Sequence, residues 1–139
     1  MTDLHAFVAG AASGPDDPAG LVEQADAALE RFARAFNACD AAGMDAALHF
    51  PHLMLSGARL LVWEAPGQHP ADFFDRLKAT GWSQTRYEDK RAVLVGPDKV
   101  HFVVVYTRRD SDGRVLTTHA NLWIVTRVGA AWGIEMRSY

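Results

Sequence analysis

The C-terminal segment of this chain constrains its fold more than any other. Between Lys99 and Tyr139, three runs that alternate apolar and polar residues are separated by Asp110-Ser111-Asp112-Gly113 and by a turn around Val128-Gly129-Ala130. Asp and Ser side chains bond the backbone of tight turns and Gly tolerates a positive φ, so both interruptions favour hairpins. The segment is therefore predicted to form a three-stranded antiparallel meander.

Helices are expected ahead of the meander. Asp17 followed by Pro18 is typical of a helix start, because Asp caps the first turn and Pro lacks the N–H that this turn leaves unpaired. The apolar stripe that follows predicts a long helix that continues to a stop at Gly43. A second helix is expected over 70–81, from Pro70 to Gly81, and further strands over 53–64 and 85–95.

The order of these elements predicts one α+β domain over residues 18–139, preceded by an N-terminal arm over 1–17. The chain of 139 residues has a formal charge of −3 and no basic cluster, which argues against nucleic-acid and membrane partners. A single Cys excludes an internal disulfide. The N-terminus lacks the basic start and apolar run of a secretory signal, so a cytoplasmic location is expected.

Turn chemistry also predicts the register of the meander. If Asp110 pairs with Arg114 and Arg127 pairs with Ala131, alternation assigns every side chain to one of two faces. The inner, apolar face then carries Phe102, Val104, Tyr106, Ala120, Leu122, Ile124, Trp132, Ile134 and Met136. The outer face carries His101, His119, Asn121, Trp123, Glu135, Arg137 and Tyr139. Because Trp, Tyr and Arg are enriched at protein interfaces, a homodimer through this outer face is expected.

Several motifs resemble the nuclear transport factor two-like superfamily, in particular its SnoaL-like, polyketide-cyclase type. They are Asn37-Ala38-Cys39-Asp40, Phe50-Pro51-His52, the strand from Asn121 to Arg127, and Trp132-Gly133-Ile134. The resemblance implies a cystatin-like fold, in which a cone-shaped, mostly antiparallel curved sheet wraps around a long N-terminal helix. It also implies a pocket at the wide end and frequent dimerisation through the back of the sheet. Members include ketosteroid isomerases, dehydratases, cyclases and domains that only bind.

Candidate acid–base residues are few. His49 or His52 could accept a proton at the mouth of the pocket, and Tyr106 could donate a hydrogen bond to a ligand carbonyl. The alternatives are loop histidines bonded to backbone and a core tyrosine. No metal site is expected, because Pro51 breaks the histidine pair and no further ligand completes a set. Cys39 falls on the buried helical stripe and is interpreted as a packing thiol.

Aromatic and flexible apolar residues are expected to line the ligand pocket. The candidates are Trp63, Phe73, Trp82, Phe102 and Met136. The predicted inner face of the meander has no carboxylate, although Asp40, Asp45, Glu64 and Asp72 stay open at loop edges.

Two functions remain open. In one, the domain binds a small apolar or aromatic molecule in a largely apolar pocket and acts without a cofactor as an isomerase, dehydratase or cyclase. In the other, it is a non-catalytic binding or dimerisation module.

Overall fold

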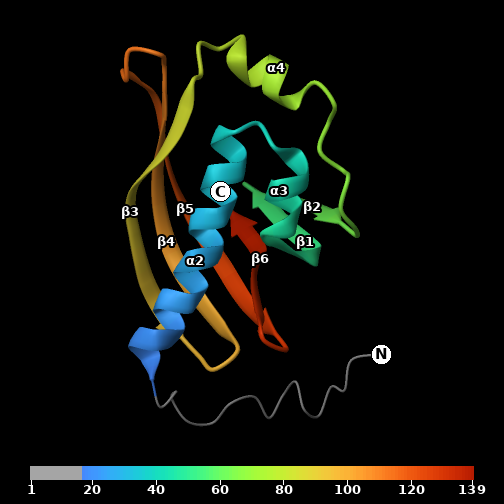
Figure 1. Ribbon diagram of the computed structural model, residues 1–139, viewed down its shortest axis with the longest axis vertical. Helices are drawn as coiled ribbons and strands as arrows, with labels where there is room; N and C mark the ends of the chain where they lie inside the picture. Colours follow the sequence, from blue (N-terminus) through green and yellow to red (C-terminus); the bar gives the residue numbers. More distant parts are fainter. Residues whose placement is uncertain (1–16) are drawn as a thin grey trace.

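The computed structural model describes residues 17–139, so the expected arm over 1–17 lies outside the described residues apart from Asp17. Its elements follow the predicted order of long helix, hairpin, short helix and antiparallel strands (Figure 1). The helices are α2 (Pro18–Asn37), α3 (Ala41–Ala46) and α4 (Phe73–Lys78). The strands are β1 (Leu48–Ser56), β2 (Arg59–Trp63), β3 (Gln84–Val95), β4 (Lys99–Arg109), β5 (Val115–Val128) and β6 (Ala131–Ser138).

Helix α2 begins as predicted but ends earlier. An Asp17 carboxylate oxygen accepts the Gly20 N–H at 3.0 Å, and Pro18 occupies the first turn. The predicted helix to Gly43 is instead two helices, because Cys39 adopts a φ of 55° and Asp40 caps α3 by accepting the Gly43 N–H at 3.0 Å. Capping Asp residues start helices and compete with continuation of a preceding one. Cys39 therefore sits in the α2–α3 turn.

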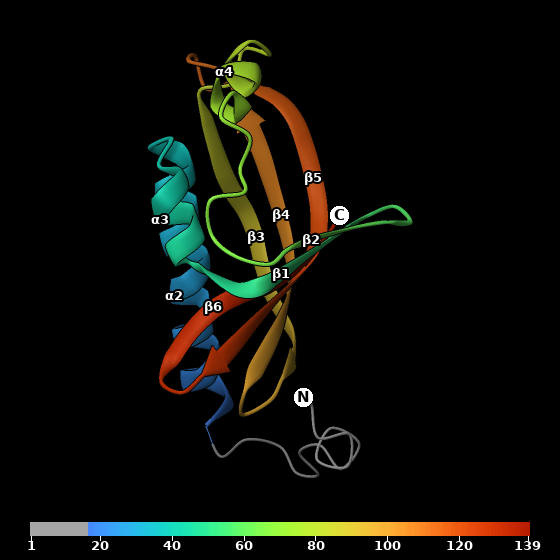
Figure 2. The same ribbon diagram turned by 90° about the vertical axis from the view of Figure 1, so that its right-hand side faces the viewer.

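The strands form one six-stranded sheet in the order β2-β1-β6-β5-β4-β3. Neighbours are antiparallel except β1 and β6, which run parallel. Helix α2 lies across one side of this sheet, and Figure 2 shows how strongly the strands curve and how far the β1–β2 hairpin projects from the body. The predicted fold, a curved sheet wrapped on a long N-terminal helix, is confirmed.

The predicted register is correct at the β4–β5 turn and wrong beyond it. The Asp110 N–H bonds the Arg114 carbonyl as predicted, and Arg109 pairs with Val115. The next pair is Arg108 with Thr117, so Leu116 is an extra residue in β5. Such a β-bulge moves every later side chain of the strand to the opposite face.

The β5–β6 ladder also departs from the prediction. Val128, rather than Arg127, pairs with Ala131. Further along, Ile124 pairs with Met136 and Val125 with Ile134, which leaves Glu135 as the extra residue of a second irregularity. The shorter turn and this extra residue together decide which β6 side chains face α2.

The face assignments are therefore corrected strand by strand. Strand β4 keeps its predicted faces, with Phe102, Val104 and Tyr106 buried and His101 on the other side. Residues wrongly assigned to the outer face are His119, Asn121, Trp123, Arg137 and Tyr139. Residues wrongly assigned to the inner face are Ala120, Leu122, Ile124 and Met136. The predicted dimer contact therefore cannot include His119, Asn121, Trp123 and Arg137, because these side chains face the interior.

The core between α2 and the sheet is well packed. Leu29, Phe102, Val125 and Ile134 are almost fully buried there. Within residues 17–139, no helix is both long and apolar enough to cross a membrane.

Candidate functional site

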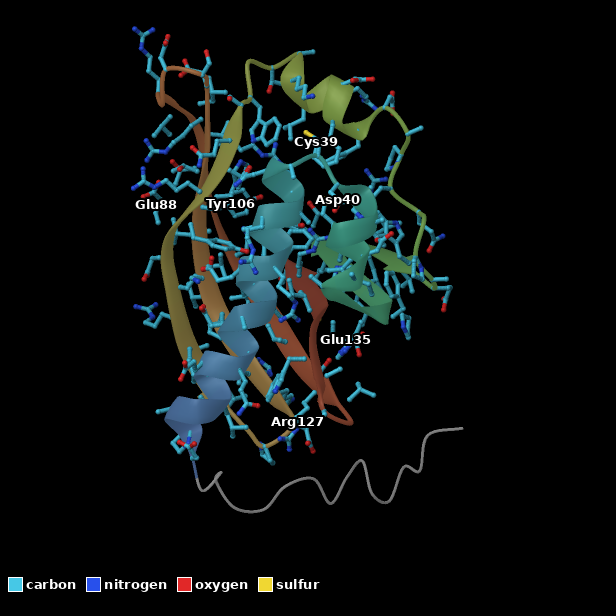
Figure 3. The ribbon with its side chains drawn as sticks, in the orientation of Figure 1. Cys39, Asp40, Glu88, Tyr106, Arg127 and Glu135 are labelled. Atoms are coloured by element: carbon cyan, nitrogen blue, oxygen red, sulfur yellow. The ribbon has the colours of Figure 1, made fainter. Side chains whose placement is uncertain are left out.

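A cavity of about 500 Å³ lies between the C-terminal half of α2, the inner face of the sheet and the segment that leads into α4. Its volume is in the range of small-molecule pockets. Figure 3 shows Tyr106, which lines it, on β4 level with the C-terminal half of α2. Aromatic residues are the largest group on the wall, with Phe32, Phe36, Trp63, Phe73, Tyr87, Trp123 and Tyr139. The polar side chains on it are Ser56, His69, Thr85, Tyr106, Arg108, His119 and Arg137.

The five predicted lining residues separate into three groups. Trp63 and Phe73 lie on the cavity wall. Trp82 and Phe102 are packed in the core instead, where Trp82 also donates its indole N–H to the Thr85 hydroxyl at 2.9 Å. Met136 pairs with Ile124 on the opposite face of the sheet, because of the register change in β6.

His52 is fully buried and holds Arg137 rather than facing the cavity. Its Nδ1 lies 2.9 Å from the Ile134 carbonyl, and its Nε2 lies 3.0 Å from Nε of Arg137. A carbonyl only accepts and a guanidinium only donates, so Nδ1 carries the proton and His52 is neutral. Burial and the charge of Arg137 lower the pKa of His52 to about 3. With both nitrogens engaged, the predicted role of His52 as a proton acceptor for a ligand is wrong.

His49 does not lie on the cavity wall either. Its Nδ1 lies 2.9 Å from the Thr126 hydroxyl, and its ring packs against Gly133, where an added Cβ would come within 2.7 Å of the ring. Burial lowers the pKa of His49. His49 is therefore a packing residue between β1 and the β5–β6 hairpin, and its predicted place at the pocket mouth is wrong.

Tyr106 and His119 form a stacked pair on the cavity wall. Their ring centroids lie 4.8 Å apart with planes at 24°, because Leu116 shifts β5 so that His119 pairs with Tyr106. Nε2 of His119 lies 2.9 Å from the Thr117 hydroxyl. Burial raises the pKa of Tyr106 and lowers that of His119. Near neutral pH the pair thus presents a protonated phenol beside a neutral imidazole.

His69 and Asp45 form the site that the sequence analysis missed. His69 lies in the loop between β2 and α4 and lines the cavity, and Asp45 comes from α3. Nε2 of His69 lies 3.2 Å from Oδ1 of Asp45, and the two side chains are 7% and 8% exposed. The other Asp45 oxygen accepts the Gly67 N–H at 2.9 Å. The His69 ring packs edge-on against Trp63 with a centroid distance of 4.4 Å.

This arrangement suits His69 for proton transfer. Burial lowers the pKa of His69, the Asp45 carboxylate opposes this effect, and the charge of Arg137 adds to it. The imidazole is therefore neutral at pH 7 and can accept a proton. Nε2 is the ring nitrogen beside the carboxylate, although the two atoms lie outside hydrogen-bond geometry, and the tautomer with Nε2–H leaves Nδ1 as the basic nitrogen. A histidine base that is oriented by a neighbouring carboxylate is a common arrangement in proton-transfer sites.

A curved sheet wrapped on a long N-terminal helix, with a cavity between them, belongs to a known class of fold. Residues 22–136 match the protein family described as "NTF2-like protein (DUF6841)", where NTF2 stands for nuclear transport factor two. The chain therefore belongs to the NTF2-like proteins, as its motifs predicted. Comparison with curated proteins finds no match.

Solved structures show the same fold. An NTF2-like protein with a cystatin-like fold from Novosphingobium aromaticivorans has a TM-score of 0.64 and 17% identity, over 99% of this chain and 89% of that one. Rv3472(D26N) of Mycobacterium tuberculosis, described as of unknown function, has a TM-score of 0.63 and 15% identity, over 92% and 76%. A Shewanella frigidimarina protein provisionally assigned as a ketosteroid isomerase has a TM-score of 0.60 and 9% identity, over 86% of this chain and 96% of that one. Identities this low establish the fold alone.

Proposed function

We propose that this protein binds a small aromatic or apolar molecule in the cavity and catalyses a cofactor-free proton transfer on it, as an isomerase, dehydratase or cyclase does. The observation that carries the proposal is that His69 lies on the wall of an aromatic cavity with the Asp45 carboxylate 3.2 Å from its Nε2. Aromatic walls with few convergent polar groups are typical of small-molecule sites. A neutral histidine with an orienting carboxylate is typical of general bases.

In the proposed step, Nδ1 of His69 takes a proton from a carbon next to a carbonyl group of the ligand. The electron pair of the broken C–H bond moves into the carbonyl, which becomes an enolate. The Tyr106 hydroxyl donates a hydrogen bond to the enolate oxygen, and the protonated His69 is stabilised by Asp45. In a ligand with a β,γ double bond, return of the proton from His69 to the γ carbon completes an isomerisation. In a ligand with a β-hydroxyl group, the enolate expels hydroxide, which takes the proton from His69 and leaves as water, and this completes a dehydration.

The proposal is tested with 2-tetralone, a bicyclic aromatic ketone with acidic C–H bonds, dissolved in D₂O. The wild-type protein is expected to accelerate deuterium incorporation at the carbons beside the carbonyl, measured by NMR. His69→Gln should lower that rate by about 100-fold or more, the usual contribution of a general base. His49→Gln is the matched control, since His49 is a half-buried histidine outside the cavity, and it should retain the wild-type rate. Equal rates for wild-type and His69→Gln would contradict the proposal.

A second candidate function rests on the outer face of the sheet. Val103, Val105, Leu122 and Ile124 gather there, each half-buried, while the described helices lie on the other side or at the end of the sheet (Figures 1 and 2). Contiguous apolar surface of this kind favours association with another protein. As the second candidate we propose a homodimer through this face, with these residues in place of His119, Asn121, Trp123 and Arg137, and the domain as a dimerisation module.

A further inference from the structure

Arg137 is a buried cation without an anionic partner. It is 6% exposed, and no carboxylate within residues 17–139 lies in ion-pair distance of its guanidinium. Rings of Phe32, Trp123 and Tyr139 surround it, with the guanidinium carbon 4.9 Å from the Phe32 centroid and 5.9 Å from the other two. Aromatic faces attract a cation, but they do not neutralise its charge. Buried charges are normally paired, so this one calls for an explanation.

The hydrogen bonds of Arg137 hold it in place and leave donors free. Nε donates to Nε2 of His52 at 3.0 Å, and one terminal nitrogen donates to the Met54 sulfur at 3.3 Å. Sulfur is a weak acceptor, and the other terminal nitrogen has no hydrogen-bond partner among residues 17–139. His52 is neutral, so it orients the guanidinium without compensating its charge. Arg137 therefore has strong, fixed donors that the described chain does not use.

These donors belong to a side chain on the cavity wall. The wall also carries Arg108, His69 and His119, and none of the described residues that line it is Asp or Glu. Asp45, the carboxylate beside His69, is not among the lining residues, and Gly67 occupies its second oxygen. The balance of charge on the wall is thus positive within an apolar enclosure, which favours an anionic ligand.

The geometry points to a specific class of ligand, and this inference rests on the proposed function of the cavity. We propose that Arg137 is an anion-binding residue and that the cavity takes an aromatic or alicyclic carboxylate, with the ring among the aromatic side chains and the carboxylate on the guanidinium. A guanidinium matches a planar carboxylate well.

The test compares 1-naphthoate with 1-naphthamide, which share size and ring but differ in charge. Calorimetric titration at pH 7 should show that wild-type protein binds the naphthoate at least about tenfold more tightly, since hydrogen bonds to charged groups are the stronger ones. Arg137→Gln should remove this preference while still binding the amide. Arg127→Gln is the matched control, because its guanidinium also lies over an aromatic ring, 5.6 Å from the Trp132 centroid, but Arg127 is not among the residues that line the cavity, and it should keep the preference. A preference that Arg137→Gln leaves intact would overturn the assignment.

The wild-type measurement stands even if Arg137→Gln does not fold, because equal affinities for the two compounds would already overturn the inference. If Arg137→Gln does not fold, Arg137→Lys, which keeps the charge, serves as the second variant and should retain part of the preference for the naphthoate. Binding of the amide and naphthoate with equal affinity would leave the proposed small-molecule cavity intact and refute only the anion subsite. Binding of neither compound, together with no exchange of 2-tetralone, would refute both.

Discussion

The two faces of β5 have opposite characters, and the polar one is inside. Facing α2 and the cavity are His119, Asn121, Trp123 and Val125, while Leu122 and Ile124 face away. An ordinary two-layer domain places its aliphatic residues inside and its polar ones in water. Here the inner face holds the ring systems and hydrogen-bonding groups of a cavity, and the outer face is aliphatic. The cavity explains the polar inner face, and the proposed homodimer is the explanation offered for the aliphatic outer face.

Adjacent positions of β5 provide the largest test of this contrast. Trp123 is 3% exposed and meets Phe32 edge-on at 5.6 Å, so Trp123→Ala should lower the free energy of unfolding by about 3–5 kcal/mol. Ile124→Ala, on the half-buried outer side, should lower it by about 1 kcal/mol in the monomer. Urea unfolding at low protein concentration measures both. Similar losses for the two variants would mean that the faces are not distinct.

The fold could be predicted because its sequence signals are local. Which side chains lie on which face of the sheet could not be predicted, because that depends on the exact register of the strands. Turn residues at Asp110–Gly113 and alternation along the strands are short-range patterns, and they located the hairpin correctly. The bulge at Leu116 has no such signature, since Val115-Leu116-Thr117 reads as continuous strand and no Gly marks the extra residue. One unmarked residue reverses the parity of all that follows. The error was largest for β5, where aliphatic residues were assumed to be inside.

The candidate site was only partly predictable for a related reason. Tyr106 and Trp63 were identified from residue type and strand position, and they do lie on the cavity wall. His69 comes from an irregular loop and meets Asp45 only through the tertiary fold. Asp45, on helix α3, had been considered among the loop-edge carboxylates, but its partner His69 lies in a loop, and no periodicity predicts where a loop side chain points. Pairs formed across such loops need coordinates.

Buried histidine on the inner side predicts a pH dependence of stability. The pKa of His52 in the folded protein is about 3, below its value of about 6.5 in the unfolded chain, so unfolding takes up a proton between these values. The stabilisation is complete above pH 6.5 and is lost as pH falls toward 3, by up to about 1.4 kcal/mol per pH unit. Lowered pKa values at His49, His69, His101 and His119 act in the same direction.

His52→Gln isolates the contribution of His52, because an amide can still accept from Arg137 and donate to the Ile134 carbonyl. Between pH 6 and 4.5, the unfolding free energy of this variant should fall less steeply than that of the wild type, by up to about 1.4 kcal/mol per pH unit. Chemical denaturation across this range measures the slopes. Parallel slopes for the two proteins would show that His52 is not held neutral.

The side-chain caps of α2 and α3 are chemically alike, but only one of them lies near the His69–Asp45 pair. Asp17→Ala and Asp40→Ala each remove a side-chain cap and should each lower the unfolding free energy by about 1 kcal/mol. Only Asp40 caps the helix that carries Asp45. If loss of this cap displaces Asp45, the pKa of His69 should fall, because the carboxylate raises it. NMR titration of His69 should therefore separate Asp40→Ala from Asp17→Ala, and the same His69 pKa in both variants would show that the cap does not position the pair.

The smallest expected effect on stability comes from the outer face, where the effect on association should be the clearest. Leu122→Lys places a charge at the centre of the apolar outer surface, and a long side chain can extend into water there, so the unfolding free energy of the monomer should change by only about 1 kcal/mol or less. If this surface joins two copies, sedimentation velocity should show the wild-type dimer and a monomeric variant. Val128→Lys, at the 63% exposed end of the same strand, is the matched control and should remain dimeric. A monomeric wild type would leave the aliphatic face of β5 without its proposed partner, whereas dimers that survive Leu122→Lys would place the contact elsewhere. Either result would overturn only the explanation of the outer face, because the cavity explains the polar inner face independently of what covers the outer one.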